Sequence, residues 1–493
     1  MSNEMKQTKR RKRSSHLANM GAALLSATAA FVGWGYLSGV AGASPSPTPS
    51  SVSHDREAVL NEAKKAKKHD EKNATVILND PFMQNKWGLE RTSAAKAWEI
   101  TKGSKDIVVA VIDTGIDVNH ADISDNLWKN PGETGVVEND FCKKQRNPLS
   151  LKECDKSRND VDDDGNGYKD DVYGWNFVYN DNKLTDNHGH GTHIAGIIAA
   201  NGMHNGRNTG VSGVAPNVSV MILKYYDPKA SNSNNLKNTV NAIRYAIKMK
   251  AQIINYSGGG TDYSAEEYAA VKEAERAGIL FIAAAGNERS NSDEAGKHYY
   301  PADYGLSNII SVTAVNKEET KVLPSSNYGV RTVDLAAPGE NIYSTLPNQG
   351  YGFMTGTSQA TAFVTGVAAL IMSHNRDFSS ADVKKYILRT GDEYATLLSK
   401  TGTAKLLNSF KALASLDIGV GLTGVVASNT AKIGTRTFSS DQNPKNARLN
   451  NVSALNETAD ENSAPAEEIA LFGREFMKAL EKAPAAAPEI RRR

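Results

Sequence analysis

Three residues far apart in the sequence have the chemical types needed for nucleophilic catalysis, and the first is Ser358. It lies in a Gly-Thr-Ser stretch where a small, turn-like segment becomes an apolar, helix-like pattern. A serine at the start of a helix is close to unpaired backbone N–H groups and to the positive end of the helix dipole. Such groups favour an alkoxide and can stabilise an oxyanion. Serine is also a common helix cap, so Ser358 alone does not identify an enzyme.

The second candidate lies in a histidine-rich segment. His188, His190 and His193 alternate with small residues just before a helix-like pattern. This spacing suggests a metal site, but no zincin-type glutamate accompanies the histidines and no cysteine is near. The small residues that follow would let a helix pack closely against a sheet. We therefore interpret His190 as a catalytic base at the head of that helix, with a metal site as the alternative.

The third candidate, Asp113, follows an apolar, mostly β-branched run at 107–112, which is typical of a strand buried on both faces. Open α/β sheets place ligands and chemistry at the carboxyl ends of their parallel strands. Ser257 and Asn287 also follow predicted strands, so we expect these side chains to gather on one rim of a sheet. For Asp113 alone, a simple loop cap is the alternative.

The elements that must position these residues alternate along most of the chain. The alternation predicts an α/β fold over residues 81–416, with a doubly wound parallel sheet and helices on both faces. Strands are expected at 107–112, 218–223, 253–256, 279–284, 309–315 and 333–335, and helices at 236–249, 264–277, 357–372 and 379–388. The formal net charge of +2 over 493 residues gives no reason to expect a nucleic-acid partner.

The segment before this domain predicts export. A basic cluster precedes an uncharged stretch at 17–40, and a small-residue pattern follows at 41–43. Residues 1–43 thus have the layout of a secretory signal, although the uncharged stretch is long enough to span a membrane. We expect either a cleaved signal or a membrane tether through residues 17–40. In both cases the remainder would be secreted, periplasmic or on the cell surface.

Two further segments flank the domain. Residues 44–80 are expected to form a Pro/Ser-rich linker or a short pro-segment, and residues 417–493 a low-complexity extension. Within that extension, residues 466–482 have the pattern of one short amphipathic helix. Cys142 and Cys154 are the only cysteines, and in an exported protein we expect a disulfide between them. It would stabilise the fold by roughly 3 kcal/mol in the chain-entropy description.

An acidic loop at 159–171 predicts a structural calcium ion, because so many like charges would repel each other unless a cation held them. Counted from Asp160, its oxygen-bearing residues follow the order of an EF-hand-type loop, with a glycine at the sixth position. The predicted ligands are Asp160, Asp162, Asp164, Asn166 and Asp171. A solvated acidic loop without an ion is the alternative.

The chain order of Asp113, His190 and Ser358, with the motifs around them, resembles the subtilase family of serine peptidases over residues 81–416. The resemblance implies a serine endopeptidase that cleaves protein or peptide substrates through an acyl-enzyme intermediate. Ser358 would be the nucleophile and His190 the general base, oriented by Asp113. Asn287 matches the family's oxyanion-hole asparagine, and His193 is similar to a structural histidine of the family.

The resemblance also implies where a substrate binds. The residues that would form the substrate edge and the walls of the first specificity pocket are Ser257, Gly258, Gly259, Ala284 and Gly286. Because these walls are small and carry no charge, we expect large apolar or aromatic residues before the cleaved bond.

Two departures from the family pattern leave alternatives open. Ala362 and Phe363 stand where the family usually has Pro followed by His, which makes a peptide-joining enzyme an alternative to a hydrolase. No folded inhibitory pro-domain is recognisable between residues 43 and 80. An inactive binding scaffold is a further alternative, although no catalytic or oxyanion residue is missing.

Overall fold

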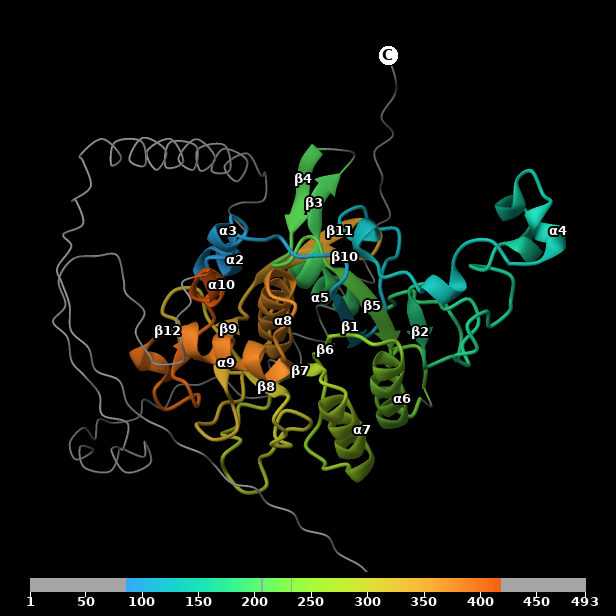
Figure 1. Ribbon diagram of the computed structural model, residues 1–493. Coiled ribbons are helices and arrows are strands. Elements are labelled where there is room, and N and C mark those ends of the chain that lie inside the picture. The colour runs from blue at the N-terminus through green and yellow to red at the C-terminus, as the bar shows by residue number, and fades with distance from the viewer. Residues whose placement is uncertain (1–85, 205–206, 232, 418–493) are drawn as a thin grey trace, which may run out of the picture. The chain divides into compact units, whose positions relative to one another are not determined.

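The computed structural model describes residues 86–417, except for 205–206 and 232 (Figure 1). The predicted signal or tether, the linker and the amphipathic helix at 466–482 lie outside the described residues. Within the described range, no helix is both long and apolar enough to span a bilayer.

A nine-stranded sheet forms the centre of the described domain, in the order β12-β13-β9-β8-β7-β6-β1-β5-β2. Its strands are β1 (Val108–Asp113), β2 (Gly174–Asn176), β5 (Ser219–Lys224), β6 (Ile253–Tyr256), β7 (Leu280–Ala284), β8 (Ile309–Val315), β9 (Leu335–Pro338), β12 (Asp392–Glu393) and β13 (Lys405–Leu406). Neighbouring strands run parallel except β12, which is antiparallel to β13. The predicted α/β class and parallel sheet are therefore confirmed.

Helices cover both faces of this sheet (Figure 1). The α-helices of the described residues are α2 (Trp87–Arg91), α3 (Ala94–Ala97), α4 (Asp140–Lys143), α5 (His190–Ala199), α6 (Asn235–Lys248), α7 (Ala265–Arg276), α8 (Thr357–His374), α9 (Ser380–Thr390) and α10 (Ser409–Asp417). Of these, α4 lies away from the sheet (Figure 1). Alternate residues of β1 show the two layers. Val109 and Val111 pack in the core that contains α5 and α8, whereas Ala110 and Ile112 pack in the core that contains α6 and α7.

Two antiparallel hairpins lie outside the sheet and were not predicted: β3 (Asn201–His204) with β4 (Arg207–Ser212), and β10 (Ile342–Leu346) with β11 (Gly350–Met354). The hydroxyl of Thr345 in β10 donates to the Thr192 carbonyl of α5 at 2.7 Å. A side chain at Gly196 would collide with Thr345, and one at Gly191 would collide with the carbonyl after β1. The small residues of α5 therefore allow the close packing expected from the sequence.

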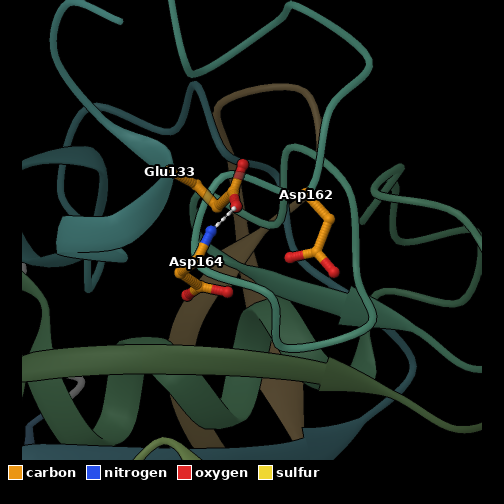
Figure 2. A group of neighbouring side chains, drawn as sticks. All are labelled: Glu133, Asp162 and Asp164. Carbon is orange, nitrogen blue, oxygen red and sulfur yellow. Dashed lines mark hydrogen bonds between the residues drawn. The ribbon is translucent and has the colours of Figure 1, made fainter. Parts of the chain in front are cut away.

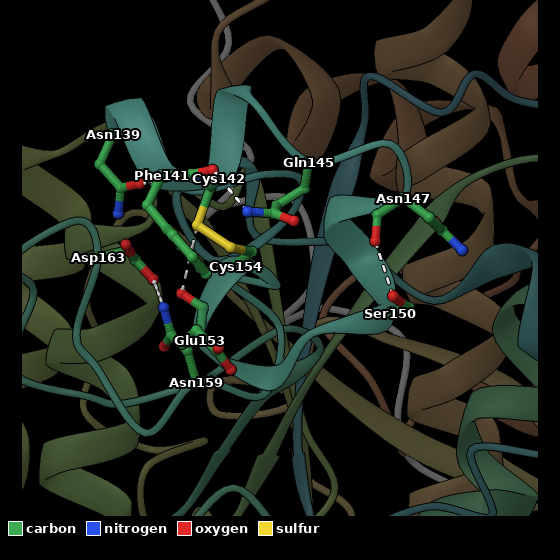
Figure 3. Close-up of a disulfide and its surroundings, with 10 residues drawn as sticks. All are labelled: Asn139, Phe141, Cys142, Gln145, Asn147, Ser150, Glu153, Cys154, Asn159 and Asp163. Carbon is green, nitrogen blue, oxygen red and sulfur yellow. Dashed lines mark hydrogen bonds between the residues drawn. A yellow bond between two sulfur atoms is a disulfide. The ribbon is translucent and has the colours of Figure 1, made fainter.

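Cys142 and Cys154 form the predicted disulfide, with their Cα atoms 5.4 Å apart (Figure 3). The bond joins α4 to the short 3₁₀ turn at Lys152–Cys154, and both cysteines are buried. The side chain of Asn139 caps α4 by accepting a hydrogen bond from the Cys142 N–H at 2.8 Å. The disulfide thus fixes the segment that leads into the acidic loop.

Candidate active site

Asp113 and His190 meet at the rim of the sheet, as expected from the resemblance to the subtilase family. Asp113 is the last residue of β1 and is buried, and His190 is the first residue of α5. Nδ1 of His190 lies 2.8 Å from Oδ1 of Asp113. Because that oxygen also accepts the Thr114 N–H at 2.8 Å, the carboxylate is held in one orientation behind the imidazole.

The electrostatic effect of this contact is to favour the charged imidazole. Burial alone would lower the pKa of His190, but the negative charge of Asp113 and its hydrogen bond outweigh burial and raise the pKa above its ordinary value. A histidine with a raised pKa accepts a proton more readily, which suits a general base.

Ser358 is the second residue of α8, at the positive end of this long buried helix. Its hydroxyl donates to the Ser257 carbonyl at 2.9 Å. Ser257 in turn donates from Oγ to the Ser358 carbonyl at 3.1 Å, so the two residues are tied together in both directions. The segment after β6 therefore passes directly beside the candidate nucleophile.

Asn287 lies on the other side of the helix start. Its Oδ1 accepts hydrogen bonds from the backbone N–H and the hydroxyl of Thr357, at 3.0 and 3.2 Å. This arrangement fixes which end of the amide faces α8 and leaves Nδ2 available as a donor. A free amide N–H beside the N–H groups of a helix start can stabilise a developing negative charge.

The surroundings of His193 indicate a structural rather than a catalytic role. It is fully buried in α5, and Nε2 donates to the carbonyls of Ile342 and Gly352 at 3.0 and 3.2 Å. Burial, followed by the nearby charge of His190, lowers its pKa to about 3. A histidine that stays neutral and bridges α5 to the β10–β11 hairpin fits the structural role implied by the sequence.

Asp186 holds the start of α5 and was not singled out from the sequence. This buried carboxylate accepts hydrogen bonds from the N–H groups of Gly189 and Thr192 at 2.7 and 2.9 Å, and from the Thr114 hydroxyl at 2.9 Å. Burial raises its pKa, but these hydrogen bonds outweigh it and lower the pKa overall. No feature of the sequence distinguishes Asp186 from an ordinary loop aspartate, and its contact to Thr114 in the structure shows that it links the Asp113 turn to α5.

The predicted substrate-binding residues lie on two neighbouring segments. Ser257, Gly258 and Gly259 follow β6, whereas Ala284 ends β7 and Gly286 comes just after it. These segments emerge side by side because β6 and β7 pair in parallel. The structure therefore brings the two predicted segments next to each other, and Ser257 of the first is hydrogen-bonded to Ser358.

A family model described as the subtilase family matches residues 104–411. The chain belongs to the subtilase family.

Among relatives of this subtilase, the major intracellular serine protease of Bacillus subtilis (strain 168) is 34% identical over 308 residues, or 61% of this chain and 81% of the relative. Thermitase of Thermoactinomyces vulgaris is 33% identical over 339 residues, which are 68% of this chain and 98% of the relative. Subtilisin-like protease 1 of Plasmodium falciparum is 34% identical over 318 residues, which are 61% of this chain and 42% of the relative. By family and relatives, the chain is a subtilisin-like serine endopeptidase.

The subtilase departs from the family pattern at Ala362 and Phe363 without interrupting α8. Both residues are buried, and the helix continues through them to His374. The Phe363 ring packs so closely against Gly88 of α2 that a side chain there would collide with it. Phe363 thus connects the serine helix to the start of the described domain.

The acidic loop of this subtilase brings together two predicted ligands and one unpredicted residue. Carboxylate oxygens of Glu133, Asp162 and Asp164 lie within 4.8 Å of one another (Figure 2). Glu133 is buried and accepts the N–H groups of Asp163 and Asp164 at 2.7 and 3.2 Å. Burial, followed by weaker repulsion from nearby aspartates, raises its pKa to about 7. Glu133 lies far before the loop, and no feature of the sequence connects it to the loop.

The other three predicted ligands have different partners. The exposed carboxylate of Asp160 pairs with Lys152. Asp171 is buried and accepts hydrogen bonds from Asn130, Asn166 and Tyr245. The Asn166 carbonyl, predicted as a calcium ligand, accepts the Lys248 ammonium group at 2.7 Å. These residues support the loop around the cluster of Glu133, Asp162 and Asp164.

Proposed function

We propose that the protein is an exported endopeptidase in which Ser358 forms an acyl-enzyme intermediate with protein or peptide substrates. The observation that carries this proposal is the hydrogen bond of 2.8 Å between His190 and Asp113, on the rim where α8 presents Ser358. An acid, a base and a hydroxyl nucleophile on one rim are the parts that acyl transfer requires.

In the first step, the Ser358 hydroxyl gives up its hydrogen bond to the Ser257 carbonyl and donates to Nε2 of His190. Nε2 takes the proton as Oγ attacks the carbonyl carbon of the substrate. Asp113 keeps the other proton of the imidazole on Nδ1, so that Nε2 is free to act as the base, and it stabilises the imidazolium that forms.

The attack places a negative charge on the carbonyl oxygen. The Ser358 backbone N–H and the Nδ2 group of Asn287 would donate to this oxygen. His190 then gives its proton to the leaving amine, the C–N bond breaks and the acyl group stays on Ser358. Water, activated by His190 in the same way, releases the acyl group.

The experiment that tests this function compares Ser358→Ala with Ser373→Ala in the full chain, using a protein substrate. Both serines lie on α8, but the Ser373 hydroxyl is satisfied by the Ala369 carbonyl at the far end of the helix. Hydrolysis should fall by several orders of magnitude in Ser358→Ala, because the catalytic residues act as a unit. It should be unchanged in Ser373→Ala. Normal hydrolysis by Ser358→Ala would rule out the assignment.

For the acidic loop, we propose a structural calcium ion held by Glu133, Asp162 and Asp164. The proposal is supported by the convergence of their oxygens and by the absence of sulfur or imidazole from this donor set. Calcium prefers several oxygen ligands of this kind. A cation there would also relieve the crowding of negative charge around Glu133.

Export is supported by the signal-like sequence of residues 1–43 and by the disulfide between Cys142 and Cys154. The Bacillus subtilis relative is named an intracellular protease, so the family alone does not set the compartment. Fractionation of the native host tests the proposal: the protein should occur outside the cytoplasm, with its N-terminus either cleaved near residue 43 or retained in the membrane. A full-length protein found only in the cytosol would contradict export.

A further inference from the structure

The side chain of the substrate residue before the cleaved bond has to extend between two segments of the enzyme. In the proposed mechanism, the carbonyl carbon under attack would lie beside Oγ of Ser358, which is 2.9 Å from the Ser257 carbonyl oxygen, and the oxygen of the attacked carbonyl would face Asn287. The substrate residue that carries this carbonyl would therefore lie between the segments that follow β6 and β7. These segments stay close because Tyr256 pairs with Ala283 at the ends of the two strands.

The ring of Tyr299 occupies the space between these segments. A methyl group added to Gly259 would lie 2.5 Å from Cε1 of Tyr299, and one added to Gly286 would lie 2.7 Å from Cδ2. Cε1 and Cδ2 are opposite corners of the ring, so the ring lies between the two glycines. Carbon atoms in favourable contact are about 3.5–4.0 Å apart. Neither wall therefore has room for a methyl group beside the ring.

The backbone around Tyr299 is anchored. Its N–H donates to Oδ2 of Asp303 at 2.9 Å. The next residue, Tyr300, exchanges two backbone hydrogen bonds with Gly260, at 2.7 and 2.9 Å. Burial, followed by the charges of nearby glutamates, raises the pKa of the Tyr299 phenol, so the ring is neutral at ordinary pH.

We propose that Tyr299 makes the first specificity pocket shallow and that the enzyme cleaves after small residues, namely Gly, Ala or Ser. This inference rests on the proposed function of Ser358 and adds the substrate class. It replaces the sequence-based expectation of large apolar or aromatic residues. That expectation considered only the small wall residues and not a ring inserted from a separate segment.

A set of peptides that differ only in the residue before the cut tests the proposal, with Ala, Ser, Leu, Phe or Arg at that position. The wild-type enzyme should have a kcat/KM for Ala at least about tenfold above that for Phe. Tyr299→Gly should open the pocket and raise kcat/KM for Phe relative to Ala by roughly 10- to 200-fold, the range for a change of hydrophobic pocket size.

Two variants serve as matched controls. Tyr299→Phe keeps the ring and should keep the wild-type preference. Tyr300→Ala removes the adjacent ring, which stacks on Tyr304 at 4.9 Å, and should also keep the preference. A wild-type preference for Phe, Leu or Arg would overturn the proposal, as would an unchanged preference in Tyr299→Gly.

A binding measurement tests the pocket without turnover. In the Ser358→Ala variant, calorimetry should show tighter binding of a peptide ending in Ala than of the same peptide ending in Phe. Addition of Tyr299→Gly should reverse that order. If the full chain cleaves no peptide but binds the Ala peptide more tightly than the Phe peptide, the proposed function is contradicted and the shallow pocket is supported. The opposite binding order would overturn the pocket whether or not the chain cleaves.

Discussion

Nζ of Lys224 lies 2.7 Å from Oδ2 of Asp227, and both side chains are almost completely shielded from water. Lys224 ends β5 directly opposite Asp113 of β1. Asp227 also accepts a hydrogen bond at 2.7 Å from Asn187, in the segment that leads to His190. The ion pair therefore connects the two parts of the chain that carry the Asp–His contact.

Replacing Lys224 should show the cost of breaking this pair. Lys224→Met leaves Asp227 buried without its counter-ion, which should lower the free energy of unfolding by roughly 3–5 kcal/mol. It should also lower kcat/KM, because the segment before His190 loses an anchor. Urea denaturation and peptide hydrolysis measure the two effects. Lys297→Met, which breaks an exposed pair with Glu294, is the matched control and should change little. Equal stability of the two variants would contradict the role of the buried pair.

The pH dependence of hydrolysis should report the ionisation of His190. Because the base must be neutral, kcat/KM should rise with pH, with a midpoint above the ordinary histidine value of about 6.5. Asp113→Asn removes the charge that raises this pKa. The variant should move the midpoint to lower pH and reduce kcat by about 10⁴-fold. If the midpoint does not move in Asp113→Asn, the rise of kcat/KM with pH reports the ionisation of another group.

The same raised pKa has a consequence for stability. The folded pKa of His190 exceeds its unfolded value, so protonation favours the folded state. This contribution is fully present below the unfolded pKa and is lost as pH rises through the folded pKa. Denaturation curves measured across that window should show the loss in the wild type and a smaller loss in Asp113→Asn.

Asn287 should matter for turnover more than for binding. Asn287→Leu removes the Nδ2 donor and should lower kcat by about 10²–10³-fold with little change in KM. Asn287→Asp keeps the size of the side chain but replaces the donor with a charged oxygen, so it should be at least as impaired. Steady-state kinetics with one peptide measure kcat and KM for each variant. An active Asn287→Asp enzyme would exclude the proposed donor.

Calcium should stabilise the protein through the acidic cluster. A chelator should lower Tm, and calcium, but not magnesium, should restore it. Asp162→Ala combined with Asp164→Ala should abolish this response, and Glu133→Gln should weaken it. Asp160→Ala should retain it, because the Asp160 carboxylate pairs with Lys152 outside the cluster. A full calcium response in the double variant would place the ion elsewhere.

The sequence predicts the fold well because the fold follows from local patterns. β6 and β8 occur at the predicted residues, and α5 begins at His190 as expected. Asp113 could be placed because a buried strand ends in a polar residue at the rim of a parallel sheet. The contact of Asp113 with His190 was expected from the resemblance to the subtilase family, and the structure contains it.

Features that depend on distant contacts were not predictable in this way. Glu133 joins the acidic loop only through tertiary packing, since its own segment carries no ligand pattern. Tyr299 lies in a loop, and its position between two glycines of other segments is set by folding alone. The β10–β11 hairpin was missed for a related reason: its partner surface is α5, far away in sequence.

The most direct test is labelling of the full chain with a fluorophosphonate, which phosphonylates an activated serine hydroxyl as the P–F bond breaks and fluoride leaves. Mass spectrometry of the digested protein should find the modification on Ser358, with hydrolytic activity lost in proportion. Labelling should be absent in Ser358→Ala and much slower in His190→Ala, because the hydroxyl then has no base. Modification of a different serine with loss of activity, or full activity after stoichiometric labelling of Ser358, would contradict the assignment of Ser358 as the nucleophile.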